Sequence, residues 1–250
     1  MNYCDHWQYR VDPPQSGAEN MRVDRALLTW AEESVNSVTA VRFYRWSRPT
    51  ISLGRNQKPP EAVNTEFCRQ QGLPIVLRPT GGRAVLHHNE VTYALVSNDP
   101  EFFPLKDISE TYRLIAQALQ AGLKQLGISV RLAKGSPDSH RFTGSGHKNP
   151  CFASSSRYEL LSEGLKIVGS AQRRLRRSFL QHGSIPLQVD YSQMAQALAS
   201  EELLLRKKVI SVLEAGGREF TFEEVCQALK EGIEKTFSIR LESSPFLPTL

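Results

Sequence analysis

A series of short strand candidates separated by glycine and proline most restricts how this chain can fold. Pro49 divides the first two candidates, and Gly81 with Gly82 forms a turn between the third and the fourth. Turns this short join antiparallel strands, because parallel strands need much longer crossover connections. The pattern therefore predicts hairpins more than crossovers. The candidates in this part of the chain cover residues 40–46, 50–53, 73–78, 84–86 and 91–96.

Helical spacing of apolar residues occurs between these strands and dominates the end of the chain. The segment 107–127 is the strongest example, with one apolar stripe and Gly127 as a stop signal. Thr221 and Glu224 form a capping-box signature for the last helix. The predicted helices are 20–34, 61–71, 107–127, 191–208 and 219–237, and the further predicted strands are 158–161, 165–171 and 179–189.

These elements predict an α+β fold in which helices flank a mixed β-sheet. The length allows one large domain or two small ones. We expect a single domain over 1–250, with a core at about 20–190 and a C-terminal helical segment, 191–250, packed on it.

The charge balance is close to neutral, with 31 Lys plus Arg against 26 Asp plus Glu and a net charge of +5. Apolar runs stay far below the roughly 18 residues of a membrane span. The first ten residues lack the apolar centre of a secretory peptide, so we expect a cytoplasmic protein with reduced thiols. One local basic cluster predicts an acidic partner surface, with a solvated turn as the alternative. It comprises Arg173, Arg174, Arg176 and Arg177.

Common nucleotide and metal motifs do not occur in the sequence. It has no Gly-x-x-x-x-Gly-Lys-Ser/Thr run, and the glycines at 144 and 146 do not complete a dinucleotide fingerprint. His87 and His88 lie near Glu90, but adjacent strand residues point to opposite faces and cannot easily share a metal. We therefore predict no metal site and no cofactor.

The first of three informative segments runs from Arg78 to His87. Gly81 and Gly82 let the backbone approach a ligand closely, and the turn exposes N–H groups to a carbonyl, carboxylate or phosphate. Arg78 and Arg83 add charged donors, and His87 follows on the next strand. The alternative interpretation is an ordinary β-turn with solvated arginines.

The second segment, 165–172, places Lys166 in an otherwise apolar and small-residue strand. Such a lysine is partly desolvated and is a plausible base or electrostatic partner for a thiolate. The alternative is an edge-strand lysine that keeps its ammonium in water.

The third segment places Cys151 at the end of a long polar loop, 136–150. An exposed loop cysteine near basic groups has the surroundings of a nucleophile. Most free cysteines instead behave as small buried hydrophobic residues, and Cys68 and Cys226 fit that description. Cys4 lies in the N-terminal tail and receives no role.

In combination and in order, these segments resemble the LipM family of octanoyltransferases, within the biotin/lipoate protein ligase superfamily. The resemblance covers most of the chain. Two departures concern polar contacts: Leu77 stands where relatives often have a second arginine, and His88 where they often have an acidic residue. The matching segments are 21–28, 43–46 with 49–57, 78–93, 151–159, 166–172 and 181–184.

The resemblance implies a catalytic fold like that of class II aminoacyl-tRNA synthetases and biotin synthetase. It implies transfer of octanoyl from acyl carrier protein to a lysine of a lipoyl domain, such as that of the glycine cleavage H protein or a 2-oxoacid dehydrogenase E2. It also implies that Cys151 is the acyl-thioester nucleophile and that Lys166 lowers the pKa of its thiol. The residues it implies for the acyl pocket are Arg78, Gly81, Gly82, His87, Gly169, Ser170 and Ala171.

Three other functions remain open at this stage. A lipoate–protein ligase shares the fold but activates free lipoate with ATP, and then Lys166 contacts the acyl-adenylate while Cys151 is incidental. An amidotransferase takes octanoyl from the glycine cleavage H protein. A nucleic-acid-binding protein would use the arginine cluster, but that cluster lacks interleaved aromatic residues for stacking.

Overall fold

The computed structural model describes residues 6–134 and 158–244. Cys4 and Cys151 lie outside these residues. The helices are α1 (Gly17–Glu33), α2 (Pro59–Ala62), α3 (Thr65–Gln70), α4 (Ile108–Gln125), α5 (Tyr191–Ala197), α6 (Glu202–Arg206), α7 (Val212–Gly216) and α8 (Phe222–Phe237). The strands are β1 (His6–Val11), β2 (Thr39–Tyr44), β3 (Thr50–Leu53), β4 (Ile75–Leu77), β5 (Val85–His87), β6 (Glu90–Ser97), β7 (Arg131–Lys134), β8 (Tyr158–Ser162), β9 (Leu165–Arg174), β10 (Phe179–Pro186) and β11 (Arg240–Ser243).

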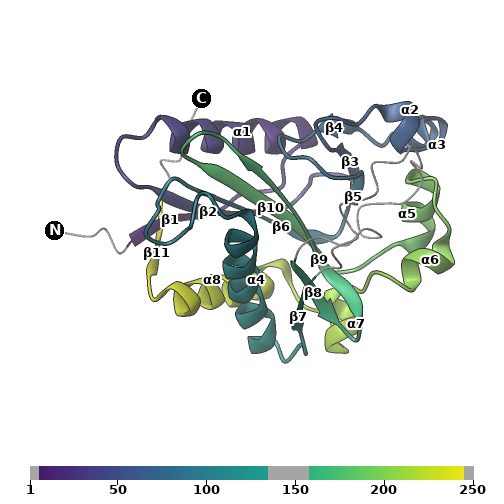
Figure 1. Ribbon diagram of the computed structural model, residues 1–250. Coiled ribbons are helices and arrows are strands. Elements are labelled where there is room, and N and C mark those ends of the chain that lie inside the picture. Colours follow the sequence, from purple (N-terminus) through teal and green to yellow (C-terminus); the bar gives the residue numbers. More distant parts are fainter. Residues whose placement is uncertain (1–5, 135–157, 245–250) are drawn as a thin grey trace.

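Within the described residues, the strands form one sheet of eight strands and one of three (Figure 1). The large sheet has the order β11-β1-β2-β6-β10-β9-β8-β7, and the small sheet has the order β4-β3-β5. In the large sheet, each neighbouring pair in the row β2-β6-β10-β9-β8-β7 is antiparallel, whereas β1 pairs parallel with both β2 and β11. In the small sheet, β3 pairs parallel with β4. The predicted α+β fold with a mixed sheet is confirmed.

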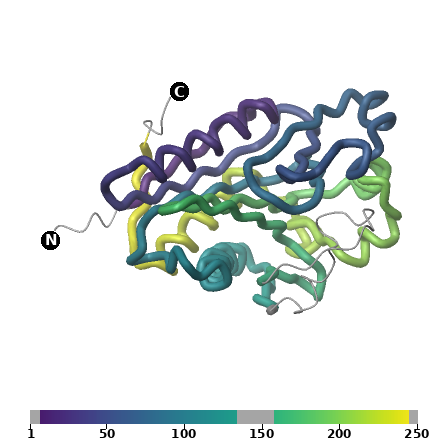
Figure 2. The backbone as a smooth tube through the Cα atoms, turned by 45° about the horizontal axis from the view of Figure 1, so that its top comes forward, coloured from purple at the N-terminus to yellow at the C-terminus, as the bar shows by residue number. Residues whose placement is uncertain are grey.

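Helices cover both faces of the large sheet (Figures 1 and 2). Helix α1 packs on one face against β6 and β10, and α4 and α8 pack together on the other. Strand β2 contributes side chains to the hydrophobic cores on both faces of the sheet, because successive side chains of a strand point to opposite faces. Val41 and Phe43 enter the core with α4 and α8, while Ala40 and Tyr44 enter the core with α1.

Helices α4 and α8 both begin at side-chain caps, and the capping box of α8 confirms the sequence prediction. Asp107 caps α4 by accepting a hydrogen bond from the Glu110 N–H, and Thr221 with Glu224 forms the capping box of α8. Gly122 lies inside α4 because α8 crosses there: a Cβ on it would come within 2.7 Å of the Ala228 carbonyl oxygen. None of the helices in the described parts of the chain is long and apolar enough to cross a membrane.

Two predicted helices are each interrupted. Residues 61–71 divide into α2 and α3 because Asn64 takes extended backbone and caps α3, its side chain accepting from the Phe67 N–H. Residues 191–208 divide into α5 and α6, and Ala199 between them has a left-handed φ of 48°. Helical spacing alone did not reveal either break.

The turn at Gly81 and Gly82 does not close a hairpin, because β3 lies between β4 and β5. The small sheet is instead covered by the C-terminal helices, where Leu53 shares a buried cluster with Met194 and Leu205. This packing brings the C-terminal segment beside the start of β9 in the large sheet. A pocket lies between the two sheets.

Candidate active site

A pocket opens where the small sheet meets α1 and the strands β9 and β10. It holds about 360 Å³ of empty space, part of which is open to solvent, and its exposed lining is mainly apolar. Five residues proposed from the sequence line it, and they come from the first two of the three informative segments. These are Arg78, His87, Gly169, Ser170 and Ala171.

Small residues on β9 and β10 create the space for this pocket. Gly183 lies opposite Ser170 in the antiparallel pairing of the two strands. A Cβ on Gly183 would lie 2.5 Å from Cε1 of Tyr93 and 2.6 Å from the Gly169 carbonyl oxygen. Any larger side chain at this position must therefore displace its neighbours.

The guanidinium of Arg78 is directed toward the protein around it, and it is buried. Nη1 donates to the carbonyl and hydroxyl of Ser52 at 3.0 and 3.2 Å, and Nε donates to the Thr80 hydroxyl at 3.2 Å. Nη2 donates to the carbonyls of Gly81 and Arg83 at 2.8 and 2.7 Å. The loop thus folds around this side chain, and the interpretation as solvated turn arginines is wrong for Arg78.

The remaining predicted residues of this loop do not line the pocket. Gly82 has a φ of 93°, which L side chains rarely adopt. The Gly82 carbonyl oxygen packs on Gly54, and a Cβ on Gly54 would lie 2.0 Å from that oxygen. Arg83 is half-buried and contributes its carbonyl to the Arg78 contact. Gly81, Gly82 and Arg83 therefore form the loop beside the pocket wall.

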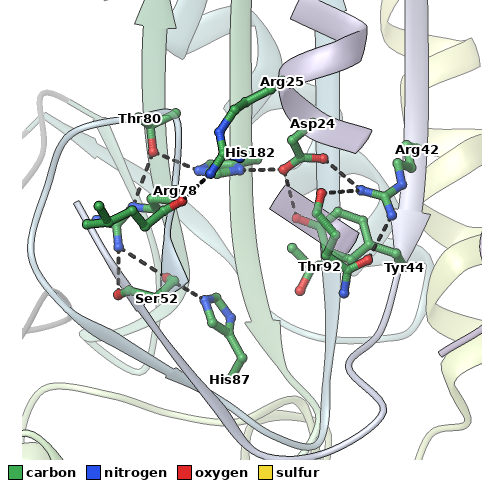
Figure 3. A network of polar contacts seen from close by, with 12 residues as sticks. Asp24, Arg25, Arg42, Tyr44, Ser52, Arg78, Thr80, His87, Thr92 and His182 are labelled. Atoms are coloured by element: carbon green, nitrogen blue, oxygen red, sulfur yellow. Dashed lines mark hydrogen bonds and ion pairs between the residues drawn. The ribbon is translucent and has the colours of Figure 1, made fainter. Parts of the chain in front are cut away.

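One polar chain runs from Arg78 through Ser52 to His87 in the small sheet (Figure 3), and His87 in turn contacts a buried carboxylate. The Ser52 hydroxyl lies 2.7 Å from His87 Nε2, and His87 Nδ1 lies 2.8 Å from the Glu90 carboxylate. Trp46 stacks on the His87 ring at 4.0 Å and also donates to Glu90. Burial raises the pKa of Glu90, but the interaction with His87 and the hydrogen bonds from Ser184 and Thr92 together outweigh it, and the net shift is downward.

A second chain runs from Arg78 toward α1 (Figure 3). The Thr80 hydroxyl lies 2.7 Å from His182 Nε2, and His182 Nδ1 lies 2.8 Å from the Asp24 carboxylate. Arg42 pairs with Asp24 at 2.7 Å in the same buried cluster. Burial lowers the pKa of His182, so its imidazole is neutral near pH 7, donating to Asp24 and accepting from Thr80.

These two chains explain how a buried guanidinium is tolerated beside an apolar pocket. A buried charge needs hydrogen bonds and compensating charge. The two hydroxyls that accept from Arg78 each contact a histidine, and each histidine contacts a carboxylate. The network fixes the orientation of His87 and His182, which both line the pocket.

Lys166 lies at the start of β9, three residues before Gly169, and does not itself line the pocket. It is 5% exposed, and its ammonium pairs with the Glu159 carboxylate at 3.0 Å. The predicted desolvated lysine is therefore present. The alternative, an edge-strand lysine with its ammonium in water, is wrong.

Sequence reasoning places the reactive thiol at Cys151, which lies outside the described residues. Cys68 and Cys226 are 1% and 3% exposed, as predicted for structural cysteines. Burial raises the pKa of both thiols, which disfavours the reactive thiolate.

The predicted basic cluster does not form one free patch. Arg174 donates to the carbonyl of Asp107 at 3.0 Å and to the Thr111 hydroxyl at 2.7 Å, which ties β9 to the start of α4. Arg177 donates to the Glu32 carbonyl at 2.5 Å. Part of the cluster therefore holds the fold together.

Nine further described residues line the pocket and were given no individual role by sequence reasoning, among them Tyr44, Trp46, Ser52, His182 and Gly183. Asp24 was missed as well. A signal existed for it, because an aspartate within the apolar run of α1 needs a buried partner. That partner could not be named without the fold.

Comparison with known proteins agrees with this geometry. Residues 16–234 match the family model of the lipoyl protein ligase A/B catalytic domain. An octanoyltransferase LipM of Halalkalibacterium halodurans is 36% identical over 248 residues, covering 94% of this chain and 88% of the relative. Another, from Geobacillus kaustophilus, is 37% identical over 234 residues, covering 90% of this chain and 84% of the relative. The chain belongs to the LipM octanoyltransferase family.

Membership of the LipM octanoyltransferase family confirms the resemblance inferred from the sequence motifs. Solved structures agree on the fold. Lipoate-protein ligase A bound with ATP superposes with a TM-score of 0.76 at 19% identity, covering 96% of this chain and 88% of that one. A bipartite lipoate protein ligase from Thermoplasma acidophilum gives a TM-score of 0.72 at 20% identity, covering 96% and 87%.

Proposed function

We propose that this protein is an octanoyltransferase that moves octanoyl from acyl carrier protein to a lipoyl-domain lysine. The observation that carries the proposal is the mainly apolar pocket beside a buried lysine, in a chain about 36% identical to proteins named octanoyltransferase LipM. An apolar pocket suits an aliphatic acyl chain, and a few fixed polar groups orient its carbonyl end.

The proposed chemistry has two transfer steps through Cys151. Its thiolate attacks the thioester carbonyl of the donor, a new C–S bond forms to Cys151, the C–S bond to the carrier breaks, and the carrier leaves as a thiolate that takes up the proton which Cys151 had released. The lysine amine of the lipoyl domain then attacks the acyl-cysteine, the amide forms, and the cysteine thiol is regenerated. No ATP is needed, because the donor acyl group is already activated as a thioester.

Lys166 has an electrostatic role in this proposal. A fixed ammonium favours the thiolate form of a nearby cysteine and stabilises negative charge that develops on the carbonyl oxygen. The pocket residues Arg78, His87, Gly169, Ser170 and Ala171 would hold the octanoyl chain and its carbonyl. The loop with Gly81, Gly82 and Arg83 would border the thioester end.

The partners follow from the same proposal. The donor is octanoyl-acyl carrier protein, and the acceptors are apo lipoyl domains such as the glycine cleavage H protein or a 2-oxoacid dehydrogenase E2. We place the reaction in the cytoplasm and in one catalytic domain over 1–250, with the 191–250 segment packed on the 20–190 body.

Trapping the acyl-enzyme tests the thioester mechanism. After incubation with octanoyl-acyl carrier protein, mass spectrometry should find one octanoyl group on Cys151. Cys151→Ala should lose both this adduct and transfer, while Cys226→Ala, which changes a buried bystander, should keep the adduct. Full activity of Cys151→Ala would contradict the mechanism.

A further inference from the structure

Lys166 and Glu159 form an ion pair inside the protein, and Lys166 lies on the strand that also carries the pocket residues Gly169, Ser170 and Ala171. Nζ lies 3.0 Å from Oε1, and the two side chains are 6% and 14% exposed. The carboxylate reaches the lysine from the neighbouring strand β8, in which Leu161 is the residue paired with Lys166. The end of the lysine side chain is therefore held from that strand.

The backbone of Lys166 is held from the other side by the C-terminal segment. The Lys166 N–H donates to the Lys208 carbonyl at 2.8 Å, and the Ile210 N–H donates to the Lys166 carbonyl at 3.1 Å. Val209 between them is fixed in turn, because its carbonyl accepts from the Tyr191 hydroxyl at 3.0 Å. Lys166 thus has both its main chain and its ammonium constrained.

Stability alone gives little reason for such a pair. Burying two charges costs about as much as their attraction returns, and apolar replacements are often neutral. Removing only one partner is costly, because it leaves a buried charge without compensation. A buried pair on the strand that forms the pocket wall is therefore better explained by what it does to the position of the lysine.

We propose that Glu159 is a positioning residue that fixes the Lys166 ammonium for acyl transfer. This inference rests on the proposed function. By strand geometry Lys166 lies about 10 Å along β9 from Gly169 in the pocket wall. A cation that is already in place needs no reorganisation when negative charge develops in the transition state. Glu159 should therefore affect kcat more than KM.

The test uses the full chain with octanoyl-acyl carrier protein and an apo lipoyl domain. Glu159→Gln should lower kcat by at least about tenfold and change KM by less than about twofold, as expected for an interaction used in the transition state. Glu159→Asp keeps the charge and should recover part of kcat. In a Lys166→Met background, single-turnover rates should show no further effect of Glu159→Gln.

Glu234→Gln is the matched control, because it breaks another Lys–Glu pair, Lys230–Glu234 at 2.8 Å on α8. Its kcat should stay within about twofold of the wild-type value. If Glu159→Gln alone fails to fold, the double variant with Lys166→Met leaves no buried unpaired charge, and its transfer rate should equal that of Lys166→Met.

Two results would overturn the inference while leaving the proposed function intact. One is a wild-type enzyme that transfers octanoyl while Glu159→Gln has an unchanged kcat. The other is an equal loss from Glu159→Gln with and without Lys166, which would show that the carboxylate acts independently of the lysine. A wild-type protein without any transfer activity would overturn the proposed function itself.

Discussion

Replacing Arg78 by lysine should unfold the loop beside the pocket while preserving the positive charge. In the native structure, the guanidinium donates to the carbonyls of Ser52, Gly81 and Arg83 and to the hydroxyls of Ser52 and Thr80. These acceptors surround a planar fork of five N–H donors. A lysine has one nitrogen at the end of a flexible chain and cannot reach them together.

The size of the effect follows from the acceptors that lose a donor. If lysine satisfies one carbonyl, two carbonyl oxygens remain without a partner, and each costs about 1–3 kcal/mol when buried. We therefore expect Arg78→Lys to lower the free energy of unfolding by about 4 kcal/mol. Octanoyl transfer should fall with it, because the loop and His87 lose their common support.

Urea unfolding and octanoyl-transfer assays measure the two effects. Arg25→Lys is the matched control: Arg25 is an exposed arginine whose Nη2 donates to one backbone carbonyl, that of Leu77, at 2.7 Å. Arg25→Lys should lower the free energy of unfolding by less than about 1 kcal/mol. If Arg78→Lys matched Arg25→Lys in stability and kept full transfer, the guanidinium could not be what organises this loop.

Two further predictions concern the pocket wall and the buried pair of His182 and Asp24. Gly183→Ala should lower the free energy of unfolding by about 1–3 kcal/mol and raise KM for the octanoyl donor, because the added Cβ would lie 2.5 Å from Tyr93. Gly81→Ala is the control and should keep its stability, because a Cβ there meets nothing within 4 Å. Equal urea midpoints for the two variants would contradict this prediction. Acid should destabilise the protein in two stages. The pKa of His182 is lowered in the folded protein, so below about pH 6.5 the unfolded chain binds a proton that the folded protein does not, and stability falls. The pKa of Asp24 is also lowered in the folded protein, so the stability that its carboxylate contributes is lost as pH falls below about 4. Urea unfolding from pH 7.5 to 3.5 should show the first decline in the wild type and a smaller one in His182→Gln; identical profiles would refute the assignment to His182.

Elements with strong local signals agree with the sequence-based prediction. Helix α4 follows from its apolar stripe and the stop at Gly127, and α8 from its capping box. The edge strands were not predictable in this way. Strand β11 pairs with β1, as in the contact of Arg240 with His6, and no local pattern links two segments so far apart. Their stability comes from pairing, which is a property of the whole sheet.

In the site, the sequence indicated which residues matter but not which residues they contact. The motifs indicated Arg78, His87 and Lys166, and all three are buried in the region of the pocket. The sequence did not show that Arg78 directs its donors into its own loop. Nor did it show that His182 contacts Asp24, because that contact joins β10 to α1, two elements that are far apart in the chain.

The most direct test of the proposed function compares two reactions with the same apo lipoyl domain. One contains octanoyl-acyl carrier protein without ATP, and the other contains free octanoate with ATP. We predict octanoylated lipoyl domain only in the first reaction, with no product there for Cys151→Ala. Product only in the reaction with ATP would contradict the thioester route and make the protein a ligase.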